Sequence, residues 1–328
     1  MAEGASSLLA MRILVTGASG FAGSLLVPRL LSGGHEVCAL ARNQARVITA
    51  LQDSTAEGAG DVEVLRGDVL SGEGLERALA GVEVAYYLIH SMERSPAGSR
   101  TQGSFAERDQ IAAENFASAA TRANVKRIVY LGGVTGDASA PSAHLESRLE
   151  VERILLGAVP GSVALRASIV IGARSRSFRF LVRLVERLPV LTLPAWRSFR
   201  TQPIDERDVI EMLAAAATAP AGGRSLDIGG PDILTYEEMI SRIADLMLIR
   251  RPMLGLAVNI TPVASRIAAA ITAEDPELIV ALMESLQGDL LMSDDHAAGL
   301  LGVELHSFDS AVEHALRMWE QSEPLAAR

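Results

Sequence analysis

The stretch "RILVTGASGFAGSLL", residues 12–26, indicates the fold of this protein more clearly than any other. Residues 12–17 form a short apolar run that ends in glycine, and such runs are typical of buried β-strands. This Gly17 is the first of three glycines at intervals of three residues, and an apolar pattern with helical spacing continues to Gly33–Gly34. The stretch therefore predicts a strand, a glycine-rich turn and a helix over residues 21–34.

The three glycines have separate physical roles in a turn that binds phosphates. Gly17 permits the tight turn, Gly20 lets the backbone approach a pyrophosphate, and Gly23 lets helix and strand pack closely. The helix N-terminus adds free N–H groups and the positive end of the helix dipole. The spacing G-x-x-G-x-x-G differs from the G-x-G-x-x-G of many dehydrogenases, and a purely structural turn is the alternative. The predicted cofactor-binding residues of this turn are Thr16, Gly17, Ser19, Gly20, Phe21 and Gly23.

The end of the second predicted strand, residues 36–42, indicates which dinucleotide binds. NAD sites usually place an Asp or Glu there, on the ribose 2′-hydroxyl. Residues 40–43 contain no acid, and Arg42 stands in that place with Arg46 one turn later. Because a cation suits a 2′-phosphate, we predict that NADP(H) is preferred and that NAD(H) remains possible. The alternative is that Arg42 is a solvated loop residue.

Asp68 and Val69 lie in "RGDV", at the end of a third predicted strand over residues 62–69. We predict that both line the cofactor and that Asp68 accepts a hydrogen bond from the adenine amino group. The alternative is that Asp68 caps a helix.

Strands and helices alternate through the first half of the chain. Further strands are expected at 82–90, 127–133 and 162–172, and further helices at 105–122 and 143–157, with a short helix ending near Gly81. Alternation implies βαβ units with right-handed crossovers, and continuous apolar strands suit a sheet covered on both faces. We predict an α/β fold with a doubly wound parallel sheet, a Rossmann domain.

The pattern changes after residue 172, where helical segments predominate. We expect helices at 176–188, 206–218, 235–249, 260–272 and 276–288, and a strand at 225–230. These segments predict a smaller, mostly helical C-terminal lobe. The predicted domains are an NAD(P)-binding domain over 11–172 and the lobe over 173–328, with part of 200–230 returning to the main sheet. Residues 1–10 are expected to be disordered or a misassigned start.

Composition argues against several classes of partner and site. The net charge of −10 and the isoelectric point of about 5.2 disfavour nucleic acid, whose binding requires neutralised phosphates. Cys38 is the single cysteine, which favours a reducing compartment. The first ten residues lack the charged start and apolar run of a secretory signal. We predict a cytoplasmic protein, and no metal site because no metal-ligand spacing is found.

One stretch, residues 253–273, is about long enough to span a membrane. Pro262 and Arg266 lie inside it, and an arginine in mid-membrane costs roughly 2.5–3.5 kcal/mol. We therefore predict an amphipathic helix and no membrane contact. The apolar C-terminal helices suggest an apolar small-molecule substrate, and a homodimer is left open.

The chain resembles atypical extended short-chain dehydrogenases/reductases, and more closely the NmrA-like NAD(P)-binding proteins with an added C-terminal domain. The resemblance covers residues 12 to about 230 and rests on "ILVTGASGFAG", "GDV", "YYLIHSM", "HLESRLEVERIL", "LRASIVIG" and "RTQPIDERDV". In that superfamily, a Tyr donates a proton to the substrate carbonyl, and a Lys four residues later lowers the pKa of this Tyr and holds the nicotinamide ribose.

This chain lacks that pair, because none of its tyrosines has a lysine four residues later. The matching positions hold His144 and Arg148, which share a helix face at i and i+4. We predict that His144 acts in proton transfer and that Arg148 holds the ribose or a phosphate. The alternative gives both residues structural roles.

Other candidates surround the same place. Tyr87 and His90 lie near the C-terminal end of the fourth strand, where α/β sheets bind ligands, and both are candidate catalytic residues. Tyr86 and Tyr87 must point to opposite faces, so at most one faces the cofactor. Asn115 matches an Asn position that supports the active site in the superfamily, or else it is a helix-surface amide.

Four arginines form a basic stripe on the helix predicted at 176–188. They either bind an acidic ligand or, as the simpler interpretation, form a solvated face of the helix. The stripe consists of Arg176, Arg179, Arg183 and Arg187.

The sequence thus predicts an NADP(H)-dependent oxidoreductase that reduces a carbonyl or enone of an apolar small molecule without the Tyr–Lys pair. Two alternatives remain open. One is a redox sensor that binds NADP(H) without turning it over, and the other is a scaffold subunit of a membrane-associated complex.

Overall fold

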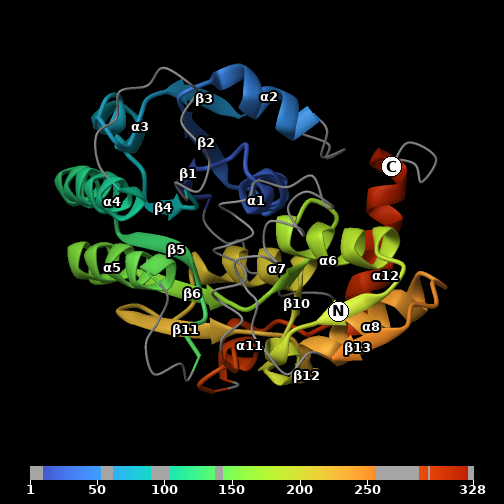
Figure 1. Cartoon of the computed structure of the whole chain (residues 1–328). Helices are drawn as coiled ribbons and strands as arrows, with labels where there is room; N and C mark the ends of the chain where they lie inside the picture. Colours follow the sequence, from blue (N-terminus) through green and yellow to red (C-terminus); the bar gives the residue numbers. More distant parts are fainter. Residues whose placement is uncertain are drawn as a thin grey trace, which may run out of the picture. The chain divides into compact units, whose positions relative to one another are not determined.

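The computed structural model describes residues 10–52, 62–89, 104–136, 143–255, 288–294 and 296–323. Figure 1 labels the helices and strands along the chain. The chain divides into two compact units. The first unit consists of Met1–Leu131, Glu150–Ala164 and Leu213–Arg224, and the second of Gly132–Leu149, Leu165–Met212 and Ser225–Arg328.

A seven-stranded sheet has the order β11-β6-β5-β4-β1-β2-β3. The pairings of β1 with β2 and β4, of β2 with β3 and of β4 with β5 are parallel. This order turns back at β1, so the switch point of the sheet lies between β1 and β4, where open α/β sheets bind ligands. The strands are β1 (Arg12–Thr16), β2 (Glu36–Ala41), β3 (Glu63–Arg66), β4 (Val84–Tyr87), β5 (Arg127–Gly133), β6 (Val163–Ala167) and β11 (Arg224–Ile228).

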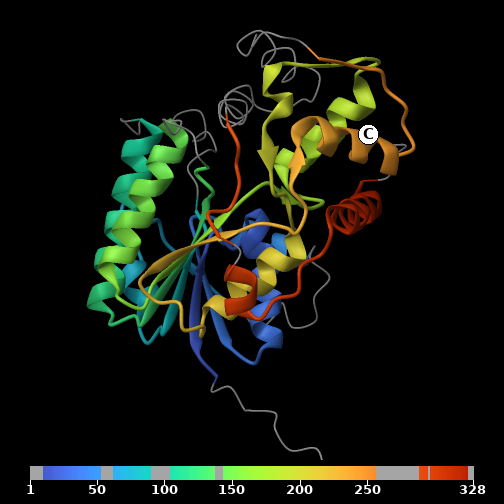
Figure 2. The ribbon, with the colours of Figure 1, turned by 90° about the horizontal axis from the view of Figure 1, so that it is seen from below.

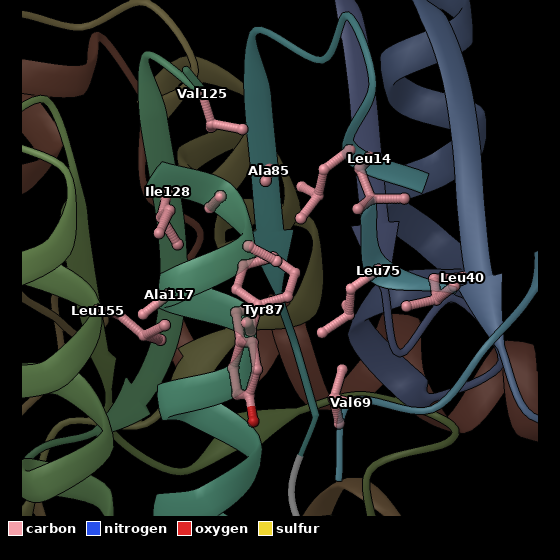
Figure 3. Packing of buried hydrophobic residues seen from close by; sticks show 14 of the residues in the cluster. Leu14, Leu40, Val69, Leu75, Ala85, Tyr87, Ala117, Val125, Ile128 and Leu155 are labelled. Atoms are coloured by element: carbon pink, nitrogen blue, oxygen red, sulfur yellow. The ribbon is translucent and has the colours of Figure 1, made fainter. Parts of the chain in front are cut away.

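Helices cover both faces of the sheet in the first unit, with α1 on one face and α4 on the other (Figure 2). One face packs Leu14, Leu40 and Tyr87 against apolar side chains of α3 and α4 (Figure 3). A capping box at Ser104 and Glu107 starts α4. The helices that follow the first five strands are α1 (Phe21–Ser32), α2 (Gln44–Gln52), α3 (Leu75–Leu79), α4 (Phe105–Arg122) and α5 (Ala143–Ala158).

The second unit has its own apolar core, built mainly from α6, α8 and α12. Its helices are α6 (Arg176–Arg187), the start of α7 (Glu206–Ala216), α8 (Tyr236–Leu246), α11 (His296–Leu301) and α12 (Phe308–Ser322). Short strand pairs join β7 (Val170–Ile171) with β10 (Ile204–Asp205), β9 (Arg200–Thr201) with β12 (Leu234–Thr235), and β8 (Leu191–Leu193) with β13 (Met253–Gly255). A 3₁₀ turn, η2, spans Ala195–Ser198.

The predicted α/β fold with a doubly wound sheet is confirmed, and the helix at 105–122 and the strand at 127–133 have the expected bounds. The predicted strand at 162–172 is interrupted after Ala167, where β6 ends before β7 begins. Helices α2, α11 and α12 were not predicted. The helices expected at 260–272 and 276–288 and the extension at 1–10 lie wholly or almost wholly outside the described residues.

Among the described residues, no helix is both long enough and apolar enough to cross a membrane. Most of the stretch 253–273 lies outside the described residues.

Candidate dinucleotide-binding site

The turn between β1 and α1 fits its glycines so closely that no other residue could replace two of them. Gly17 has a φ of 79°, and a Cβ built on it would lie 2.5 Å from the backbone oxygen of Leu88. A Cβ on Gly23 would lie 2.3 Å from the backbone oxygen of Gly17. The first contact brings the end of β4 against the turn, and the second brings α1 against β1. Leu88 was not predicted, because any residue could supply a carbonyl.

Gly20 is different, because neither its backbone conformation nor its surroundings require a glycine. It is exposed, has a φ of −80°, and a Cβ there would lie 3.1 Å from the oxygen of Gly17. Gly20 is the N-cap of α1, where no side chain caps the helix and no acid occupies the first turn. The first N–H groups of a helix need a partner from outside it. This helix start therefore fits a phosphate.

Three other residues predicted in the turn differ in exposure. Thr16 is fully buried, and its hydroxyl donates to the backbone oxygen of Tyr86 at 2.8 Å, which ties β1 to β4. Ser19 and Phe21 are half-buried. Their contact with a cofactor stays a prediction.

Arg42 directly follows β2 and is exposed. Among the described residues, no hydrogen bond or ion pair engages its guanidinium. Asp68 lies in the loop between β3 and α3, where one carboxylate oxygen accepts from the N–H of Leu70 at 2.9 Å. This is a turn held by the aspartate, not a helix N-cap, because the N-cap of α3 is Gly74. The side chain of Val69 is buried in the core beneath the loop (Figure 3).

The two tyrosines of β4 point to opposite faces of the sheet, as predicted, and both are buried. Tyr87 lies among the apolar side chains of one face (Figure 3) and packs edge-on against Phe116, with ring centroids 5.1 Å apart. The hydroxyl of Tyr86 donates to the backbone oxygen of Leu213 on α7 at 2.8 Å. Burial raises the pKa of each phenol well above its usual range. The burial and the partners of both tyrosines indicate packing roles, and a catalytic role of Tyr87 is not supported by these contacts.

Arg148 lies on α5 and is half-buried. It lies beside Gly133, where a Cβ would be 3.6 Å from Nη1 of Arg148. Gly133 is the last residue of β5, so Arg148 lies beside the carboxyl end of this strand. His90 and the side chain of His144 lie outside the described residues, although the backbone of His144 belongs to α5.

The basic stripe of α6 meets the C-terminal helix. Arg179 pairs with Glu323 at 2.7 Å and lies over the ring of Trp319, 4.5 Å from its centroid, and Arg183 lies over the same ring at 5.9 Å. A purely solvated stripe is therefore wrong for these two arginines. This partner could not be foreseen, because α12 was not predicted.

The sequence matches the NAD(P)H-binding family over residues 17–158. The chain therefore carries an NAD(P)H-binding domain over these residues, which is consistent with the resemblance to short-chain dehydrogenases/reductases. The NAD(P)-binding domain begins at the glycine turn and includes Arg42 and Asp68, so the match covers most of the predicted cofactor site.

Two curated proteins are similar to this chain in sequence. NADH dehydrogenase (ubiquinone) 1 alpha subcomplex subunit 9, mitochondrial, from Arabidopsis thaliana is 24% identical over 250 residues, covering 74% of this chain and 60% of that protein. A 3-beta-hydroxysteroid dehydrogenase from Mycolicibacterium neoaurum is 30% identical over 166 residues, covering 44% of this chain and 43% of that protein. The chain thus spans three-fifths or less of the length of these two relatives.

Solved structures extend the likeness along the chain. The structure of MoeE5 in complex with UDP-glucose and NAD has a TM-score of 0.67 and 20% identity, covering 95% of this chain and 99% of that one. At this identity the likeness shows the fold alone.

Proposed function

We propose that this protein is an NADP(H)-dependent oxidoreductase of the atypical, NmrA-like branch, which reduces a carbonyl or enone of an apolar small molecule. The glycine turn carries the proposal, because its uncapped helix start and the exposed backbone of Gly20 leave a place for a pyrophosphate. The name of the steroid dehydrogenase relative supports both the hydride chemistry and the apolar substrate.

Arg42 supports the choice of NADP(H). Its guanidinium follows β2 directly and is exposed, and no acid stands beside it at residues 40–43. A guanidinium binds phosphate oxygens with charge-assisted hydrogen bonds, whereas a ribose hydroxyl prefers a carboxylate.

NADP(H), when bound, supplies or accepts the hydride. In the proposal, His144 exchanges the proton at the substrate oxygen and Arg148 holds the cofactor, because they take the places of the missing Tyr and Lys on one turn of α5. The position of Arg148 beside the end of β5 supports this role, because ligands bind at the carboxyl ends of the strands in open α/β sheets.

Two substitutions separate these roles. Because positioned acid–base groups contribute about 10²–10⁴-fold in rate, His144→Ala should lower turnover by that order and leave NADPH affinity nearly unchanged. Arg148→Ala should weaken NADPH binding. Stopped-flow assays with a panel of ketones, aldehydes, enones and quinones measure turnover, and calorimetry measures affinity.

Exposed residues of the same types provide the controls. Arg153 is one turn further along α5 and pairs with Glu150 at the surface, and His296 is exposed on α11. Arg153→Ala and His296→Ala should leave both measurements unchanged. If His144→Ala turns a substrate over at the wild-type rate, His144 is not the proton donor.

A second candidate is an NADP(H)-binding subunit that transfers no hydride. The absence of a Tyr–Lys pair from the sequence favours it, and so does the likeness to a subunit of NADH dehydrogenase. This protein would bind NADPH yet oxidise it at the buffer rate with every member of the panel.

A further inference from the structure

The loop between β3 and α3, residues 67–74, is fitted against the end of β2. The N–H of Gly67 donates to the backbone oxygen of Ala41 at 3.1 Å. A Cβ on Gly67 would lie 2.6 Å from Cδ1 of Leu40 and 2.5 Å from the oxygen of Glu73, so only glycine allows this approach. Ala41 directly precedes Arg42. The loop that carries Asp68 and the strand end that carries Arg42 are therefore held together.

Asp68 is fixed by the loop's own hydrogen bonds. Its N–H donates to the oxygen of Glu73, and its backbone oxygen accepts from the N–H of Gly72, both at 2.9 Å. Oδ1 accepts from Leu70. Among the described residues, Oδ2 has no hydrogen-bond partner. The loop thus fixes the half-buried Asp68 by three hydrogen bonds and leaves its second carboxylate oxygen for a ligand.

Asn115 ties this loop to helix α4. Its side-chain Nδ2 donates to the backbone oxygen of Val69 at 3.1 Å and to that of Leu70 at 2.9 Å. These bonds use both donor hydrogens of the amide and join residues 45 and 46 positions apart in sequence. The side chain of Val69 lies buried on the same loop (Figure 3), so the loop is held by the core and by Asn115.

The helix itself gives no reason for an asparagine at this position. Asn has a weak helix propensity, and its amide competes with the helix backbone for hydrogen bonds. Asn115 is only partly exposed, in the middle of α4, and its neighbours Ala112, Ala113 and Phe116 are buried apolar residues. Its two bonds to the loop supply the reason.

We infer that Asn115 is a positioning residue for the adenine half of the cofactor, acting through the 67–74 loop. The inference rests on the proposed function, because it requires a dinucleotide with its adenine end at Asp68 and Arg42. A recognition group binds tightly only when its supporting contacts hold it in place. Asn115 therefore determines how well Asp68 and the end of β2 are ordered for adenine and the 2′-phosphate.

The test compares three variants of the full chain. Asn115→Asp keeps the size and removes both donors, Asn115→Ala removes the side chain, and Gln110→Ala is the matched control. Gln110 lies on the same helix, where its amide donates to the exposed Glu114 and, within the described part of the chain, to no other side chain. The probes are NADPH and adenosine 2′,5′-bisphosphate, which lacks the nicotinamide half, and hydrogen exchange of the loop amides is measured without ligand.

Both Asn115 variants should bind NADPH about tenfold more weakly, which corresponds to about 1.4 kcal/mol of binding free energy. Adenosine 2′,5′-bisphosphate should lose affinity by the same factor as NADPH. Exchange at the amides of Asp68, Leu70 and Gly72 should quicken, and turnover at saturating NADPH should not change. Gln110→Ala should behave as the wild type. If either Asn115→Asp or Asn115→Ala fails to fold, the other variant still tests the inference.

Three outcomes overturn the inference. If the Asn115 variants bind both probes with wild-type affinity, the hydrogen bonds from Asn115 to the loop do not position the ligand, even if hydrogen exchange in the loop becomes faster. Lower turnover with unchanged affinity assigns Asn115 to the reacting end of the site instead. Failure of the wild type to bind either probe overturns the proposed function itself, and the inference with it.

Discussion

Arg42 is the residue on which cofactor choice depends. Arg42→Glu places a carboxylate where NAD-dependent proteins have one, and the position is exposed, so the fold should tolerate the change. We expect NADPH to bind the wild type more tightly than NADH, and the variant to reverse or erase that preference by roughly tenfold to 100-fold. Titration calorimetry with both nucleotides measures the ratio.

Arg122→Glu is a matched control for charge, because Arg122 is an exposed arginine in the last turn of α4. It should leave the ratio unchanged. Equal affinities of the wild type for NADPH and NADH would refute the assignment of Arg42.

Single residues of the site were predictable when their backbone geometry follows from local spacing. Gly17 and Gly23 could be predicted because a strand–turn–helix with close packing excludes a Cβ. The burial of both Tyr86 and Tyr87 could not, because it depends on α7 and α4, which pack on opposite faces of the sheet. The contact of Asn115 with Leu70 likewise joins segments that only the fold brings together.

The junction between β10 and α7 holds a group of buried charges. Asp205 ends β10 and is bound by Arg207, and Asp208 accepts from the N–H of His306 at 2.8 Å. Glu206 lies 3.7 Å from Nε2 of His314 on α12. Burial and, to a lesser degree, the charge of Asp205 raise the pKa of Glu206 to about 7. Glu206 therefore makes stability depend on pH.

Glu206→Gln should make the protein more stable at pH 8 than the wild type, by up to about 3 kcal/mol. Between pH 4.5, the ordinary pKa of a glutamate, and about pH 7, Glu206 is protonated in the folded chain and ionised in the unfolded one. Stability contributed by this group is full below pH 4.5 and is lost as the pH rises to about 7. Urea unfolding at pH 5, 6, 7 and 8 measures the difference between the two proteins.

Burial and Arg207 lower the pKa of His314. This shift changes stability with pH in the opposite direction to Glu206. Because His314 is present in both proteins, its contribution largely cancels in the difference between them. Glu211→Gln, further along α7, is the matched control. If the free energies of unfolding of wild type and Glu206→Gln differ by a constant amount from pH 5 to pH 8, the pKa of Glu206 is not raised.

Elements of the second unit were harder to predict than those of the first. The helix α6 was expected because its apolar residues recur at helical spacing, but α12 was not, although Phe308, Val312 and Trp319 give it a buried stripe. The partner of the α6 arginines was consequently missed. In the first unit, strands and helices alternate, so each element supports the assignment of the next.

For the molecule taken together, the doubly wound sheet was predictable because one glycine turn and a run of βαβ units leave few other topologies. The return of part of 200–230 to the main sheet was also predicted, and β11 (Arg224–Ile228) is an edge strand of that sheet. The place of Gly132–Leu149 in the second unit was not predicted. These residues lie between two segments of the first unit, and a linear pattern carries no signal for such an exchange.

Binding of a dinucleotide at the start of α1 underlies every other proposal, and the two ends of this helix offer a direct test. Gly20 and Gly33 cap it with different backbones, extended at Gly20 and helical at Gly33, and neither needs a glycine: both are exposed, φ is −80° and −77°, and a Cβ would lie 3.1 Å and 3.2 Å from a backbone oxygen. Both Gly20→Val and Gly33→Val should therefore fold. Only the first covers the N–H groups proposed to bind the pyrophosphate.

The deciding quantity is the dissociation constant of NADPH, by titration calorimetry, for the wild type and these two variants. We expect binding by the wild type and by Gly33→Val, and a loss of roughly 100-fold or more for Gly20→Val with its thermal unfolding nearly unchanged. Equal affinity of Gly20→Val and Gly33→Val for NADPH would contradict binding at this helix start, because the pyrophosphate would then bind elsewhere.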